Sequence, residues 1–84
     1  MDAMEINGKL VTDVGHLSFI NNYINNVNQP YTNNIKKGLY IILDIEWAEH
    51  PDTGDAYLAV RYRSNNNHIC ICSIDSFIKN FKSL

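Results

Sequence analysis

The sequence predicts a small α+β domain: a three- to four-stranded antiparallel sheet, one helix from the N-terminal half and a short C-terminal helix. Three runs of alternating or continuous apolar residues, separated by turn signals, predict an antiparallel meander over residues 38–72. Apolar residues at helical spacing predict helices at about 14–28 and 74–82. With 84 residues, the chain is expected to form a single domain, 1–84.

The N-terminal third is predicted to contain one turn and one helix. Residues 4–12 hold the pair Asn7-Gly8, a strong tight-turn signal, and fit either a tiny hairpin or an extended edge segment. Thr12 or Asp13 can cap the following helix. The helix has four residues on its apolar stripe, namely Leu17, Ile20, Ile24 and Val27. It is expected to end before Pro30, whose ring disfavours a helical conformation at the preceding residue.

After a polar loop at 29–37, strands are predicted at about 38–48, 56–63 and 68–72. Turns centred on Asp52-Thr53 and Asn65-Asn66 pair these strands with one uniformly apolar face. The predicted pairs on that face are Ile45–Val60, Leu43–Tyr62, Trp47–Leu58, Tyr62–Ile69 and Val60–Ile71. Leu39 and Ile41 would lie on the same face, because alternate residues of a strand point to the same side.

The other face of the meander is predicted to be mixed in character. It would hold Tyr40, Ile42, Asp44 and Glu46 from the first strand, Tyr57, Ala59, Arg61 and Arg63 from the second, and His68, Cys70 and Cys72 from the third. Asp44 is expected opposite Arg61, as part of a cross-strand ion-pair ladder. This face is too charged for a core and too apolar for plain solvent surface, so either the N-terminal helix or a partner should cover it.

The C-terminal segment is predicted to be a helix capped by Ser73, with Asp75 well placed in its first turn. Together, the Gly-Leu-Tyr-x-Ile-Leu segment that starts at Gly38, the Thr-Gly-Asp turn, the short Tyr/Arg strand and the closing Ser-x-x-x-Phe resemble small SH3-like barrel modules in general layout. Such barrels usually have five strands, whereas three are placed here. We therefore assign no family and transfer no residue roles.

Composition narrows the classes of function. The net charge is −2 and there is no basic block, which argues mildly against strong non-specific nucleic-acid binding. No signal peptide and no membrane-spanning stretch are recognised, and the two cysteines are one residue apart on a strand, so a reducing cytoplasm is expected. Twelve asparagines indicate an AT-rich genome, as is common for phages and mobile elements.

No motif for catalysis, cofactor or metal binding is recognised. His68-x-Cys70-x-Cys72 lacks the knuckle spacing of a structural zinc site, since strand residues two apart diverge. Cys70 lies near His68, but no glycine loop or oxyanion-hole signature accompanies it. We expect no enzyme activity, no cofactor and no metal.

The remaining expectation is an interaction protein that binds a host protein stoichiometrically and inhibits it, within defence, toxin or nucleic-acid machinery. The expected protein interface consists of Tyr40, Ile42, Asp44, Glu46, Tyr57, Arg61 and Arg63. A homodimer formed through an open sheet edge is a further expectation. The alternative is a sheet-based RNA- or DNA-binding protein that uses Lys36, Lys37, Tyr40, Tyr57, Arg61 and Arg63.

Overall fold

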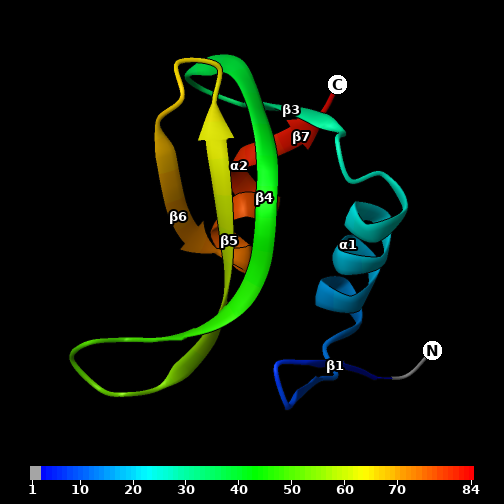
Figure 1. Ribbon diagram of the computed structural model, residues 1–84, viewed down its shortest axis with the longest axis vertical. Coiled ribbons are helices and arrows are strands. Elements are labelled where there is room, and N and C mark those ends of the chain that lie inside the picture. Colours follow the sequence, from blue (N-terminus) through cyan, green and yellow to red (C-terminus); the bar gives the residue numbers. More distant parts are fainter. Residues whose placement is uncertain (1–2) are drawn as a thin grey trace.

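The computed structural model describes residues 3–84 and confirms the α+β class (Figure 1). A two-stranded sheet, β1-β2, stands apart from a five-stranded antiparallel sheet in the order β6-β5-β4-β3-β7. In chain order the elements are β1 (Met4–Ile6), β2 (Lys9–Val11), α1 (Val14–Asn25), β3 (Pro30–Asn33), β4 (Lys37–Glu49), β5 (Ala56–Ser64), β6 (Ile69–Ser73), α2 (Ile74–Asn80) and β7 (Phe81–Ser83).

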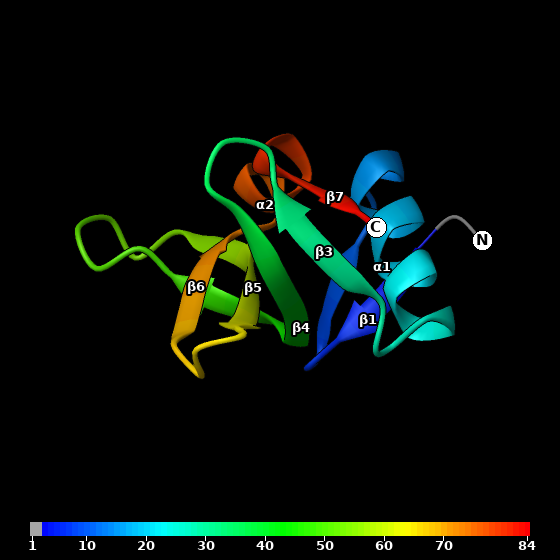
Figure 2. The same cartoon turned by 90° about the horizontal axis from the view of Figure 1, so that it is seen from above.

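The main sheet has five strands instead of three to four. The first addition is β3, which occupies the segment predicted as a polar loop and pairs with β4. The second is β7, which occupies the end of the predicted C-terminal helix and pairs with β3. Figure 2 shows these two strands lying side by side.

Both helices are shorter than predicted. Asp13, rather than Thr12, is the N-cap of α1 and accepts a hydrogen bond from the His16 N–H at 2.9 Å. The helix ends at Asn25 instead of residue 28, because Asn26 leaves the helical conformation with φ −141°. At the other end of the chain, Ser73 caps α2 as predicted, but Phe81 turns into β7.

The N-terminal segment forms the tiny hairpin, one of its two predicted conformations. Asn7 and Gly8 both have positive φ, 50° and 84°, as a type I′ turn requires. The hairpin covers one end of the core, where Val11 is buried. Its Lys9 ammonium lies 5.3 Å from the ring centre of Trp47 on β4.

The β4–β5 register is partly as predicted. Ile45 pairs with Val60 and Trp47 with Leu58, but Tyr62 pairs with Ile42 and not with Leu43. The cause is a bulge between Ile42 and Asp44, which inserts one unpaired residue and reverses the facing of the chain before it.

The bulge corrects the predicted facing of the first half of β4. Ile42, placed on the mixed face by its spacing, is a core residue with 2% exposure. Tyr40 also turns inward, where its ring meets Tyr62 and Phe81 at 5.8 and 5.1 Å. Leu39, predicted for the core, is instead 47% exposed.

The β5–β6 register is shifted by one residue from the prediction. Tyr62 pairs with Cys70 and Val60 with Cys72, so the predicted pairs with Ile69 and Ile71 are wrong. The hairpin uses three loop residues instead of two, with Asn67 in the left-handed region at φ 65°.

The core lies between one face of β4, β5 and β6 and the two helices. In Figure 1, α2 lies behind these strands and α1 lies beside β4. The core comprises Val11, Leu17, Ile20, Tyr31, Ile42, Ile45, Leu58, Val60, Ile74 and Phe77. The face of the three strands that packs on this core is called the inner face below, and the opposite one the outer face.

Candidate interaction surface

Two cross-strand rows of side chains cover the middle of the outer face. The pairing places Ile41, Arg63 and Ile69 in one row and Asp44, Arg61 and Ile71 in the next. Ile69 and Ile71 are 59% and 58% exposed. Neither helix lies in front of this face in Figure 1. Each of the two arginines therefore has an exposed isoleucine beside it on β6.

An ion pair anchors the second row. The Nε–H of Arg61 donates to both carboxylate oxygens of Asp44, at 3.3 and 3.1 Å, and Nη2 donates to Oδ2 at 2.5 Å. These hydrogen bonds and the charge of Asp44 raise the pKa of Arg61 above its usual value. The pair was predicted from spacing, and the contact holds the guanidinium against the sheet.

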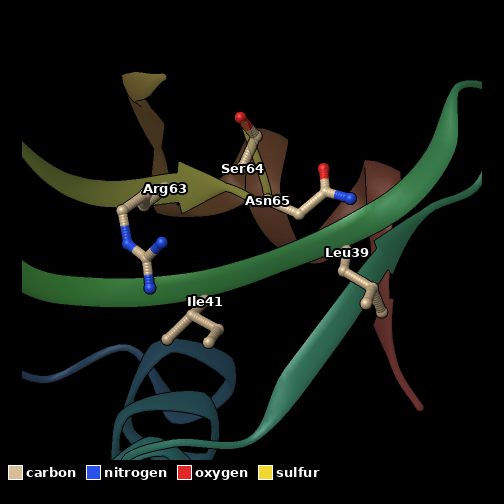
Figure 3. Close-up of a pocket in the computed structure, with 5 residues that line it drawn as sticks. All are labelled: Leu39, Ile41, Arg63, Ser64 and Asn65. Atoms are coloured by element: carbon tan, nitrogen blue, oxygen red, sulfur yellow. The ribbon is translucent and has the colours of Figure 1, made fainter. Parts of the chain in front are cut away.

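The first row borders a shallow hollow of about 230 Å³ lined by Leu39, Ile41, Arg63, Ser64 and Asn65. Figure 3 shows Ile41 and Arg63 next to each other on adjacent strands, with Leu39 farther along β4. Arg63 Nη1 donates to Asn67 Oδ1 at 2.9 Å. The Arg63 head thus contacts a neutral amide, and within residues 3–84 no carboxylate forms an ion pair with it.

The predicted protein interface is only partly assembled on this face. The pairing places Asp44, Glu46, Tyr57, Arg61 and Arg63 there, whereas Tyr40 and Ile42 belong to the inner face. Spacing missed the four aliphatic residues of the outer face, Leu39, Ile41, Ile69 and Ile71. The signal that could have placed Ile69 and Ile71 correctly is Asn67. An asparagine readily adopts the left-handed conformation that a three-residue hairpin loop needs, and that loop length sets both isoleucines on the outer face.

The residues of the alternative, nucleic-acid interface do not come together. Lys36 and Lys37 lie at the β3–β4 turn, and the Lys37 ammonium donates to the Asn34 carbonyl at 2.9 Å. Tyr40 points inward. Tyr57 stacks on His50 at 4.3 Å near the β4–β5 turn, six residues along β5 from Arg63 and hence about 20 Å away.

The cysteines lie beside a half-buried tyrosine, Tyr62. Burial, followed by the nearby Cys70, raises the pKa of the Cys72 thiol. Tyr62 lies opposite Cys70, and burial with the charges of both thiols raises its pKa to about 12. His16, from α1, is 2.8 Å from Asp75 of α2 and links the two helices. Within residues 3–84, no three His, Cys, Asp or Glu side chains are grouped as metal ligands would be.

Comparison with known proteins identifies no relative. No family model, no curated protein and no solved structure matches this chain. In the part of the chain that the structure describes, no helix has the length and apolar character needed to cross a membrane.

Proposed function

We propose that the protein is a small protein-binding module and that its outer face is the binding surface. The observation that carries this proposal is the pair of rows in which an exposed isoleucine of β6, Ile69 or Ile71, lies beside Arg63 or Arg61. Arginine is enriched at the centres of protein interfaces, which are more apolar than the rest of a protein surface. In such a centre the buried apolar area supplies affinity and the guanidinium fixes orientation.

The distribution of charge favours a protein over a nucleic acid as the partner. Asp44 neutralises Arg61, and Glu46 adds a further negative charge to the same face. A phosphate backbone would meet these carboxylates, whereas a protein with an apolar centre and one acidic group would pair with Arg63. The expected role is stoichiometric binding that blocks the activity of a host protein, as for an inhibitor carried by a phage or mobile element.

A capture experiment with matched variants tests the proposal. The double variant Leu39→Ser/Ile41→Thr removes apolar area from the outer face while leaving β6 unchanged. The control is Ile35→Ser, at an 84% exposed position in the β3–β4 turn. Proteins captured from host extract by the tagged chain would be quantified by mass spectrometry after nuclease treatment, at low and high salt.

We expect one captured protein that the double variant loses by at least tenfold, that the control retains and that high salt reduces only slightly. If the double variant and the Ile35→Ser control lost that protein equally, the outer face would not be its binding site. Recovery of nucleic acid that disappears steeply with rising salt would instead favour the nucleic-acid interpretation.

A further inference from the structure

The edge of the main sheet at β6 is open. Strand β6 is the last in the order β6-β5-β4-β3-β7, and none of the described strands pairs with its far side. In Figure 1 it forms the margin of the sheet opposite α1. An unpaired edge presents backbone N–H and C=O groups that another strand can use.

The hairpin geometry shows which backbone groups face outward. The Ser64 N–H donates to the His68 carbonyl at 3.0 Å, which makes these two residues a hydrogen-bonded pair. Such pairs alternate along an antiparallel ladder. Cys70 and Cys72 therefore direct their backbone groups to β5, whereas Ile69 and Ile71 direct theirs to the open edge.

The open edge lacks the features that usually prevent strand pairing. Residues 68–73 contain no Lys, Arg, Asp, Glu or Pro, and Ile69 and Ile71 are exposed and β-branched. Protected edges carry charges, prolines or bulges. The opposite edge, β7, is only three residues long and includes Lys82. The two edges of the sheet are therefore not equivalent, and only β6 is suited to accept a strand.

We infer that β6 pairs with β6 of a second copy in an antiparallel, two-fold symmetric register centred on Cys70. This register sets Ile69 opposite the partner's Ile71, and Ile71 opposite the partner's Ile69. Because these residues direct their backbone groups outward, the two pairs form four backbone hydrogen bonds. The four isoleucines then form one apolar cluster on the outer face.

The neighbouring register, centred on Ile71, is less suitable. It would set Ile69 opposite the partner's Ser73, and so would match an apolar side chain with a hydroxyl. Ser73 is also the N-cap of α2, where its side chain accepts from the Ser76 N–H at 3.1 Å and the chain leaves the sheet. The register centred on Cys70 uses only residues that lie fully within the strand.

Charge does not oppose this dimer. The cationic residues nearest to β6 on the outer face are Arg61 and Arg63, both on β5. The two β5 strands would be three strand spacings apart, about 14 Å, and charges at that distance are largely screened at physiological salt. Because each copy contributes a single strand, we expect dimerisation to depend on concentration.

Cys70 supplies a test of the register. It would lie opposite the partner's Cys70 in a non-hydrogen-bonded pair, with Cα atoms about 4.5 Å apart, which is within the range that a disulfide can span. Treatment with diamide, which takes up two electrons and two protons from the two thiols, would join the copies. Covalent dimers would be counted on denaturing gels without reductant.

Two single-cysteine variants make this test specific. Cys72→Ser retains only Cys70 and is expected to give the covalent dimer at least tenfold faster than Cys70→Ser, which retains only Cys72. Equal rates would indicate random collision and overturn the inference. If the unsubstituted chain cross-linked and neither single-cysteine variant did, the two-fold axis of the dimer would lie at Ile71, with Cys70 opposite the partner's Cys72. That result would overturn the proposed register.

A second measurement needs no cysteine. Ile71→Lys places a charge at the edge and is expected to weaken the dimer at least tenfold in sedimentation under reducing conditions. Ile35→Lys, in the β3–β4 turn, should leave it unchanged. Amide exchange of the unsubstituted protein should slow with concentration at Ile69 and Ile71 but not at Cys70. Exchange independent of concentration at all three, or equal sedimentation of both variants, would overturn the inference and leave the proposed binding face untouched.

Discussion

The inner and outer faces of β4, β5 and β6 both carry isoleucines, but these differ in exposure to water. On the inner face, Ile42 and Ile45 are buried in the core. On the outer face, Ile69 and Ile71 meet water. Since the side chains are chemically identical, the difference in their exposure comes from strand register. The bulge in β4 and the β5–β6 loop decide which isoleucines face the core and which face water.

The largest effect is expected in the core against which the inner face packs, at Phe77 of α2. Phe77 is 1% exposed, stacks on Phe81 with ring centres 4.2 Å apart, and meets Tyr31 edge-on at 5.2 Å. Phe77→Ala should lower the free energy of unfolding by about 3–5 kcal/mol, through lost burial and the cavity left behind. Urea denaturation would measure it, with Phe77→Leu as the milder control. A loss below about 1 kcal/mol would mean that α2 does not pack as described.

The next effect compares the two faces within one strand. Ile42→Ala should cost about 2–5 kcal/mol, because Ile42 lies in the core. Leu39→Ala should cost within about 1 kcal/mol, because Leu39 is half exposed before the bulge. The same urea titration measures both variants. If the two costs were equal or reversed, the bulge between Ile42 and Asp44 would be wrong.

A smaller effect is expected at the start of α2, which follows β6 directly. Ser73→Ala removes the side chain that accepts from the Ser76 N–H, and should cost about 1 kcal/mol. Ser18→Ala, at an exposed position within α1, serves as the control and should change stability by less than about 0.5 kcal/mol. Thermal unfolding followed by circular dichroism would resolve the two, and a cost no larger than the control's would argue against the cap.

The smallest effect at neutral pH concerns the Tyr62 hydroxyl, which lies on the inner face beside the cysteines. Burial and the thiols raise its pKa from 10.0 to about 12. A pKa raised on folding means that the neutral phenol stabilises the fold fully below pH 10, and that this contribution is lost as pH rises towards about 12.

Urea midpoints between pH 8 and 12 would reveal this loss. The unsubstituted protein should lose stability more steeply above pH 10 than Tyr62→Phe, which lacks the ionisable group. Tyr57→Phe keeps Tyr62 and should follow the unsubstituted protein. Parallel pH profiles for Tyr62→Phe and the unsubstituted chain would show that Tyr62 ionises as readily in the folded as in the unfolded state.

Much of the fold could be predicted from local patterns. The three long strands, both helix caps and the β4–β5 turn follow from alternation, capping residues and turn chemistry, which act over a few residues. Strands β3 and β7 could not be predicted this way. Each is at most four residues long, and their pairing joins residues 31 and 83 through contacts far apart in sequence.

The candidate surface was harder to predict than the fold. The ion pair between Asp44 and Arg61 follows from the first hairpin and was predicted. Ile69 and Ile71 lie on the outer face because the β5–β6 loop has a third residue, Asn67, with positive φ. Tyr40 and Ile42 lie on the inner face because a bulge leaves Leu43 unpaired. Both features shift pairing by one residue, and a shift of one exchanges the faces completely.

The loop Asn65–Asn67 has a consequence for how this chain can change through descent. It joins Ser64 to His68, whose carbonyl accepts a hydrogen bond from the Ser64 N–H at 3.0 Å. Loss of one asparagine codon would leave a two-residue loop between the same two residues, so Arg63 would still lie opposite Ile69. The two faces of the sheet therefore tolerate a change of loop length, whereas the gain or loss of one codon within β6 would exchange the facing of the residues beyond it.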